Sequence, residues 1–279
     1  MSAPAGFPDR WVENAPTHGG RALRLREAWA YRELVYFLAE RDVKARYKQA
    51  VFGAGWAVVQ PVAGVLVFTL VFNRLAGVSS EGIPYVLFSL VGFLVWLYFS
   101  STLTSTTQSL VGNAALVTKV YFPRLVAPLA ALLPGLVDLA VGSMLLVVLM
   151  VYYGSVPGPA ILALPLCLLA LMFTALAAGL LLATLNVRYR DVGKLTGFLI
   201  QLWFLASPVA YPASLVGGEW EWLYWLNPMV GVIESFRWAL LDTVAPGPEL
   251  ALSALSAAGL FVLGARCFAR SERSFADVI

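Results

Sequence analysis

The sequence predicts an all-α membrane protein that crosses the bilayer six times. Of its 279 residues, 60% are hydrophobic and 13% are charged, and the mean hydropathy is +0.78. Soluble domains have about 45–50% apolar and about 25% charged residues, so the 19 basic and 16 acidic side chains are too few to cover two soluble domains. Long apolar runs, each near the roughly 20 residues that a spanning helix needs, lead to the same conclusion.

A polar arm, residues 1–26, precedes an amphipathic stretch, residues 27–50. From Trp29 to Lys48 this stretch has no Gly or Pro, and its apolar residues recur at helical spacing. The apolar side comprises Tyr31, Leu34, Phe37, Leu38 and Ala45. Such a helix lies along the membrane surface, with its basic cluster at the lipid headgroups. The cluster consists of Arg41, Lys44, Arg46 and Lys48. It either anchors the topology or docks a partner; the arm is assigned no role.

Residues 51–268 form the transmembrane domain, followed by a cytoplasmic tail at 269–279. We expect spans near 54–72, 84–111, 125–153, 159–185, 195–211 and 249–268. The fifth span is short, because Pro208 and Pro212 close it. Apart from Glu249 and Arg266 at the ends of the last span, the one formal charge in the spans is Asp138. It is expected alone and roughly 20 Å deep, as either a structural hydrogen-bonding group or a site residue.

A run of hydroxyl-bearing residues between 100 and 109 ends the second span. Small hydroxyl residues favour close helix packing and bond their own helix carbonyls at little cost. The run therefore either packs against other helices or lines a wet surface.

The placement of basic residues predicts the orientation. If the N-terminus is inside, only Arg74 and Arg237 of the 19 basic residues lie outside, as the excess of Lys and Arg in cytoplasmic loops requires. We therefore expect a multi-pass protein of the inner (cytoplasmic) membrane with both termini in the cytoplasm.

Residues 212–248, between spans five and six, are external but rich in aromatic side chains. The pair Asn227-Pro228 divides this stretch into two short helical pieces. A segment this apolar is expected to dip back into the outer leaflet as a re-entrant hairpin, which is tolerated where protein buries its backbone. An aromatic belt at the membrane interface is the alternative, and both can hold.

The sequence has no recognisable catalytic or nucleotide-binding motif. The only Gly-Lys pair, Gly193-Lys194, is followed by Leu195 and lacks the upstream glycine of a phosphate-binding loop. One His and two Cys are too few for a metal cluster. We therefore expect no catalytic residue, no metal, no cofactor and no nucleic-acid partner in this chain. ATP and Mg²⁺ would then belong to a separate subunit.

Six stretches of the chain resemble the permease subunits of polysaccharide ABC exporters. They are RELVYFLAERDVKARYKQAVFGAGWAVVQP (32–61), NAALVTKVYFPRLVAPLA (113–130), LNVRYRDVGKL (185–195), SPVAYP (207–212), LNPM (226–229) and FADVI (275–279). The resemblance implies a homodimer in the membrane bound to two ATP-binding cassette subunits. It also implies export of lipid-linked polysaccharide, of the O-antigen, capsule or teichoic acid type.

In such a permease the cytoplasmic loops dock on the ATPase subunit. Asn113 is expected to cap a helix from Ala114 to Tyr121, which Pro123 ends. The expected docking residues, on two inner loops and the surface helix, are Asn113, Val117, Lys119, Val120, Tyr121, Arg188, Arg190, Asp191, Lys194, Glu33, Arg41 and Lys44. Alternatively, the basic residues among them only enforce orientation.

The resemblance also implies that spans one and five frame the conduit and that the hairpin gates its outer end. A sugar polymer slides best along aromatic rings with a few hydrogen-bonding groups. The expected conduit residues are Trp56, Gln60, Gln201, Trp203, Phe204 and Tyr211. The expected gate residues are Trp220, Trp222, Trp225, Asn227, Pro228, Glu234 and Arg237.

Three other functions remain open. A permease of the same class could export a drug or small lipid. A membrane transferase acting on lipid-linked sugars would need a cluster of carboxylates at one headgroup plane, and the sequence shows none. A channel would need a ring-forming filter motif, which is also missing.

Overall fold

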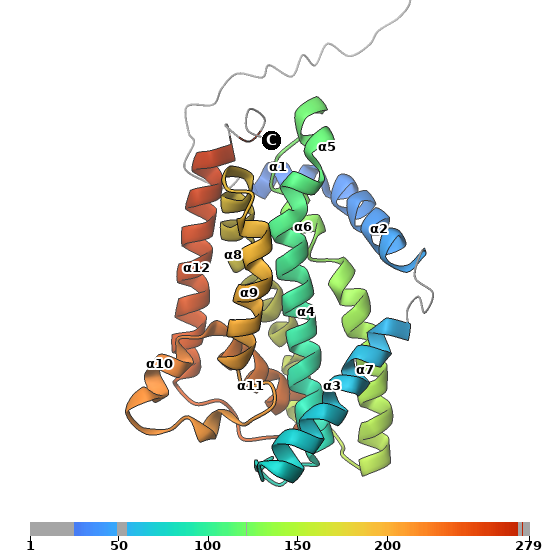
Figure 1. The fold of residues 1–279 in the computed structure, drawn as a ribbon, viewed down its shortest axis with the longest axis vertical. Helices are drawn as coiled ribbons and strands as arrows, with labels where there is room; N and C mark the ends of the chain where they lie inside the picture. Colours follow the sequence, from blue (N-terminus) through green and yellow to red (C-terminus); the bar gives the residue numbers. More distant parts are fainter. Residues whose placement is uncertain (1–24, 49–54, 121, 273–274, 276–279) are drawn as a thin grey trace, which may run out of the picture.

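The protein is a single bundle of helices in the computed structural model (Figure 1). The structure describes residues 25–48, 55–120, 122–272 and 275. Within these ranges, five helical segments are long and apolar enough to cross a membrane. They are Trp56–Leu75, Tyr85–Gly112, Val126–Tyr153, Pro159–Arg188 and Leu250–Ser271. A shorter apolar helix lies at Val192–Leu205. The predicted all-α polytopic membrane fold is confirmed.

Helix α4 (Tyr85–Gly112) is the centre of the bundle. Helices α3, α7, α8, α9 and α11 all contact it, whereas α12 packs on α8 and α11. Their bounds are α3 Trp56–Phe68, continued by the π-helix η2 at Thr69–Leu75, α7 Pro134–Tyr153, α8 Leu164–Arg188, α9 Val192–Leu205, α11 Pro228–Leu241 and α12 Leu250–Ser271. A helix with this many neighbours can present only a small part of its surface to a substrate or to lipid.

The third span is broken, not continuous as expected. It consists of α6 (Val126–Ala130) and α7, with a turn between them. Pro134 is the first residue of α7, where its missing N–H is not needed. Because proline clashes with the preceding turn of a helix, α6 cannot run on into α7. Asp138 therefore lies in the second turn of a new helix.

The fifth span also differs from its expected range, 195–211. Helix α9 ends at Leu205 and at about 1.5 Å per residue is roughly 21 Å long, shorter than a bilayer core of about 30 Å. Pro208 cannot continue the backbone ladder. The non-helical segment that follows is buried at Ser207, Val209 and Ala210, where the surrounding protein can satisfy its backbone groups.

The segment between α9 and α12 folds back against the bundle. It contains short helical pieces, which are η4 (Ala213–Leu215), η5 (Gly218–Trp220), α10 (Glu221–Trp225) and then α11. Helices α10 and α11 meet at Asn227-Pro228, as the sequence predicts. Helix α11 contacts α4, α8 and α12, as well as the 3₁₀ helix η3 (Pro159–Ala163) that precedes α8. We call this end of the molecule the hairpin end.

The amphipathic stretch forms two helices, α1 (Leu25–Ala30) and α2 (Arg32–Lys48). Leu38 and Ala39 are buried, and Leu34 and Val35 are half-buried. The other three residues of the expected apolar side, Tyr31, Phe37 and Ala45, are exposed on the protein, so the bundle covers only part of that side. The reason is that α2 packs on α6 and α7 along one narrow strip, which the periodicity alone does not locate.

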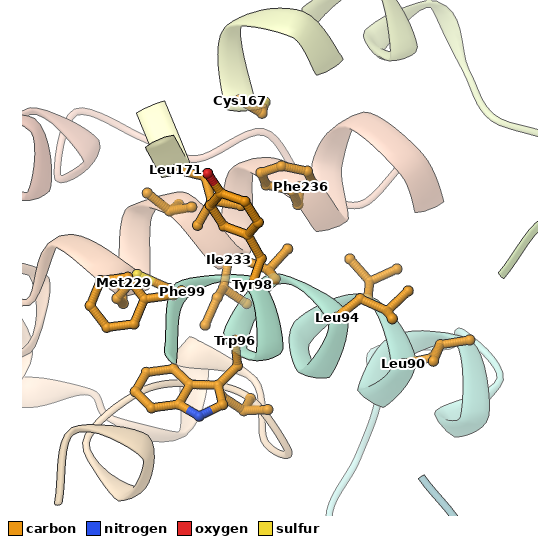
Figure 2. Close-up of a cluster of buried hydrophobic side chains, with 14 of the residues drawn as sticks. Leu90, Leu94, Trp96, Tyr98, Phe99, Cys167, Leu171, Met229, Ile233 and Phe236 are labelled. Atoms are coloured by element: carbon orange, nitrogen blue, oxygen red, sulfur yellow. The ribbon is translucent and has the colours of Figure 1, made fainter. Parts of the chain in front are cut away.

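Two apolar clusters hold the bundle together. The larger cluster surrounds α4, and Figure 2 shows part of it, with Tyr98 and Phe99 of α4 beside Met229, Ile233 and Phe236 of α11. The smaller cluster lies at the opposite end of the molecule from the hairpin, which we call the α5 end after α5 (Ala114–Lys119). It joins Leu38, Leu110, Val117, Phe122, Leu125, Phe268 and Phe275. Each end of the bundle therefore has its own packing core.

Candidate functional site: a polar groove, a clamped hairpin and an exposed loop surface

A polar groove of about 560 Å³ is lined by residues of α2, α3, α4, α7 and α9. The predicted conduit residues Trp56 and Gln60 of α3 and Gln201 of α9 line it. Helix α4 contributes the hydroxyls of Ser100, Ser101 and Thr104. Tyr98 is also in the lining, but it is buried and donates its hydroxyl to the Leu132 carbonyl at 3.1 Å. Indole, amide and hydroxyl groups in one groove can stack on a sugar ring and bond its hydroxyls.

The hydroxyl run of α4 serves two purposes. Ser100, Ser101 and Thr104 line the groove, and each donates a hydrogen bond to a carbonyl of its own helix. Thr106 and Thr107 are buried against other helices. One face of the run therefore packs against other helices, as one interpretation of the sequence expects, and another face lines the groove.

Asp138 has two hydrogen-bonding partners, although the sequence predicts that it stands alone. Its two carboxylate oxygens accept hydrogen bonds from the Arg46 guanidinium and the Tyr47 hydroxyl, both in the last turn of α2. The Arg46 and Asp138 side chains are 33% and 28% exposed, so the protein encloses the pair only in part. Burial, and then the bond to Asp138, raise the pKa of Tyr47 to about 12, so its hydroxyl remains a donor at neutral pH. All three residues line the groove.

The other predicted conduit residues do not line the groove. Trp203 Nε1 donates to Asn227 Oδ1 at 2.7 Å, and its ring packs edge-on against Phe99. The Phe204 ring lies against Phe68 and Trp96. The Tyr211 hydroxyl donates to the Leu205 carbonyl. Of the conduit residues expected in the fifth span, only Gln201 lines the groove, because successive residues of a helix point in different directions.

Asn227 fastens the hairpin to the end of α9. Its Oδ1 accepts from the backbone N–H of Met229 at 3.0 Å, which caps α11, and also from the Trp203 indole. Its Nδ2 donates to the Ala206 carbonyl at 2.9 Å and to Ser207 Oγ at 3.0 Å. One side chain therefore fixes both the start of α11 and the end of α9.

Arg237 fastens the hairpin to α4, and its side chain is fully buried. Its Nη1 donates to Glu234 Oε1 at 2.9 Å and its Nη2 to the Val209 carbonyl at 3.0 Å. Its guanidinium carbon lies 3.6 Å from the centroid of the Phe88 ring. A buried charge is tolerated when it is paired and hydrogen-bonded in this way. A Cβ at Gly92 of α4 would lie 2.6 Å from the Val209 oxygen. The close approach of α4 to the segment after α9 therefore needs a glycine at this position.

The predicted gate residues therefore divide into two groups. Asn227 and Arg237 link the hairpin to the bundle, Glu234 pairs with Arg237, and Trp225 and Pro228 are buried. Trp220 and Trp222 are 68% and 59% exposed. The exposed pair is where this segment can meet lipid headgroups or a substrate.

At the α5 end, several predicted docking residues form an exposed, charged surface. They are Lys119, Val120, Arg188, Arg190, Asp191 and Lys194, together with Glu33, Arg41 and Lys44 of α2. The α8–α9 turn is fixed to α4, because the Asn186 side chain donates to the Thr107 carbonyl at 3.0 Å. The charged side chains next to this turn therefore extend from a backbone that is held in place, as a docking surface requires.

Two docking predictions are corrected, and one lies outside the described residues. Val117 is fully buried in the cluster at the α5 end, because the short helix turns this side chain inward; it cannot contact a partner. Asn113 does not cap α5 with its side chain, which instead donates to the Ser109 carbonyl at 2.7 Å. Helix α5 ends at Lys119, and Tyr121 is not among the described residues.

The sequence analysis missed the partners of Asp138. Arg46 was assigned to the headgroup cluster, and Tyr47 was given no role. The signal in the sequence was the unpaired charge itself, since a charge at membrane depth requires a partner. Which residue becomes the partner of Asp138 depended on the tilt of α2.

Among the described residues, no three metal-ligating side chains come together.

Comparison with known proteins agrees with this architecture. Residues 33–241 match the family described as ABC-2 type transporter. The chain is 31% identical over 259 residues to the O-antigen export system permease protein RfbA of Myxococcus xanthus, covering 91% of this chain and 98% of that one. It is 26% identical over 249 residues to the RfbA of Klebsiella pneumoniae, covering 88% and 95%. The polysialic acid transport protein KpsM of Escherichia coli is 24% identical over 213 residues, covering 74% and 79%.

Proposed function

The chain belongs to the ABC-2 type transporter family, and from that premise we propose that it is the permease subunit of an exporter that moves lipid-linked polysaccharide out of the cytoplasm. Relatives named for O-antigen export and polysialic acid transport support this substrate class. The observation that carries the proposal is the groove in which Trp56, Gln60 and Gln201 meet the hydroxyls of α4. Polymers of the O-antigen, capsule or teichoic acid type all present the sugar rings that such a groove suits.

The energy for export comes, in this proposal, from two copies of a separate ATP-binding cassette subunit, which hold the ATP and Mg²⁺. Exposed side chains at the α5 end support docking there, in particular Lys119, Val120 and Arg190. The α5 end is then cytoplasmic, as are both termini, and the hairpin end is external.

The permease acts as a homodimer in this proposal. Gln60 and Gln201 are exposed on otherwise apolar helices, and polar groups facing lipid are costly. The neighbouring faces of α3 and α9 are apolar and exposed, for example at Leu66 and Phe198. A second copy placed against these faces would close the groove into a conduit. Native mass spectrometry of the purified chain would count the subunits, and a monomer in the complex with its ATPase would contradict this step.

Export in living cells tests the substrate. In a strain lacking its own permease, the double variant Gln60→Leu/Gln201→Leu is expected to reduce glycan at the cell surface by about tenfold, because hydrogen bonds to the moving polymer are lost. The control is Val59→Leu, an exposed position of α3 outside the groove, which should export normally. Normal export by the double variant would refute the conduit, and no glycan export by the wild type would refute the substrate.

Labelling of intact cells tests the orientation. A Lys119→Cys variant should resist a maleimide that cannot cross the membrane, whereas Trp222→Cys should react, since both positions are exposed on the protein. The reverse pattern would overturn the proposed topology.

A further inference from the structure

The end of helix α2 is held against α7 by one carboxylate. Arg46 Nη1 donates to Asp138 Oδ2 and the Tyr47 hydroxyl donates to Asp138 Oδ1. Both donors belong to the last turn of α2, and Asp138 lies near the start of α7. In Figure 1, α2 leans outward from the α5 end and its last turn comes down to the top of α7.

The same donors suit a phosphate group. A guanidinium offers a planar fork of N–H donors that matches carboxylate and phosphate oxygens alike, and the hydroxyl of Tyr47 adds a neutral donor beside it. The groove behind them supplies the amides of Gln60 and Gln201. Asp138 is the one acidic residue among the groove's lining residues, so it is the internal anion that occupies these donors.

The pair is exposed enough to exchange partners. Its side chains are 33% and 28% exposed, and at the headgroup level, where α2 is expected to lie, a partly exposed ion pair contributes little net free energy. A second anion that arrives at high local concentration, such as a lipid headgroup in the adjacent leaflet, can therefore compete with Asp138. Arg46 and Tyr47, at the end of the helix expected at the membrane surface, line the groove, so headgroups at that surface would lie beside them.

We propose that Arg46 and Tyr47 form a binding site for the phosphate headgroup of a membrane lipid, and that Asp138 occupies this site until the headgroup displaces it. Displacement frees the last turn of α2 from α7 at the mouth of the groove. The identification of this lipid as the carrier of the exported glycan rests on the proposed function; the phosphate site itself does not.

Two single variants separate this site from a merely structural ion pair. A structural pair is broken by either Arg46→Gln or Asp138→Asn, so both changes would shift lipid binding in the same direction. A phosphate site predicts opposite effects, because Arg46→Gln removes a donor whereas Asp138→Asn removes the competitor. Arg46→Lys keeps the charge without the fork and should fall between wild type and Arg46→Gln. Each variant is first checked for assembly with the ATPase.

The measurement is the affinity of the purified permease–ATPase complex for short-chain phosphatidic acid, by native mass spectrometry, with phosphatidylcholine as the zwitterionic reference. We expect Arg46→Gln to weaken binding of phosphatidic acid by about tenfold, the effect of one lost charge-assisted hydrogen bond, and Asp138→Asn to tighten it by a similar factor. The matched control is Glu40→Gln, which removes a carboxylate from an ion pair of the same helix outside the groove and should leave the affinity unchanged.

Four results would overturn the inference. These are changes of the same sign in Arg46→Gln and Asp138→Asn, an equal effect of Glu40→Gln, equal effects on phosphatidylcholine, and inorganic pyrophosphate binding as tightly as the lipid. The last result would assign the site to a free anion. Glycan export does not enter this measurement, so opposite shifts in a chain that exports no glycan would leave the site standing and refute only the proposed function.

Discussion

The hairpin end and the α5 end of this bundle are held together by different kinds of interaction. At the hairpin end, the half-buried Asn227 and the fully buried Arg237 join the hairpin to the end of α9 and to α4. At the α5 end, Val117 and Phe268 belong to an apolar cluster, and α2 is attached at its far end by the partly exposed pair Arg46–Asp138.

This difference indicates where the molecule can move. Breaking a buried ion pair leaves an unpaired charge in the interior, which is strongly unfavourable. A partly exposed pair is rehydrated at little cost when it opens. The hairpin is therefore expected to move together with α4 and the end of α9, whereas the last turn of α2 can separate from α7 while the bundle stays intact.

The largest expected effect is at Arg237. Arg237→Met should lower the free energy of unfolding by about 3–5 kcal/mol, because Glu234 is left buried without its cation. Thermal unfolding of the purified protein in nanodiscs measures it. The double variant Glu234→Gln/Arg237→Met should lose less than Arg237→Met alone. An unchanged melting temperature in the single variant would show that the hairpin is not held by this pair.

Val117 and Val120 test the α5 end. Val117→Asp places a charge in the apolar cluster and should destabilise the protein by at least about 3 kcal/mol. Val120 is 51% exposed, so Val120→Asp should change stability by no more than about 0.5 kcal/mol but reduce co-purification of the ATPase. Equal stability of the two variants would contradict the inward position of Val117.

Asn227 is expected to have an intermediate effect. Asn227→Ala removes a helix cap and the bonds to α9, and should cost about 1–2 kcal/mol. Asn113→Ala is the matched change at another helix junction, where the side chain makes one bond to its own helix, and it should cost less. If the order of the two melting temperatures were reversed, the hairpin's attachment to α9 would not depend on Asn227.

The smallest expected effect on stability is at Arg46. Arg46→Gln should change the free energy of unfolding by only about 0–1 kcal/mol, because the pair is partly exposed. Thermal unfolding in the same nanodiscs gives the comparison with Arg237→Met. A loss as large as that of Arg237→Met would remove the contrast between the two ends.

Part of the candidate site could be predicted from the sequence. Gln60 and Gln201 stand out as amides within apolar runs, and both line the groove. Asn227-Pro228 predicts a helix start, and Asn227 caps that helix. These predictions succeed because they depend on local chemistry, which a few neighbouring residues determine.

Other predictions failed where the answer depended on the direction of a side chain. Trp203 and Phe204 are close in the sequence to Gln201, but they face the aromatic core instead of the groove. Val117 lies among exposed residues and is itself buried. A short helix has no long periodic pattern from which its buried side could be read.

The sequence by itself determined that the chain is a helical membrane protein, since its apolar runs can bury their backbone polar groups in a bilayer only as helices. It also determined where α11 begins, because the proline and the cap at Asn227-Pro228 act locally. Only the tertiary structure decided which charges are paired. Arg46 forms an ion pair with Asp138, and the Arg237 guanidinium lies over the Phe88 ring; both contacts join residues far apart in the chain. Such contacts follow from helix packing, to which every helix in the bundle contributes.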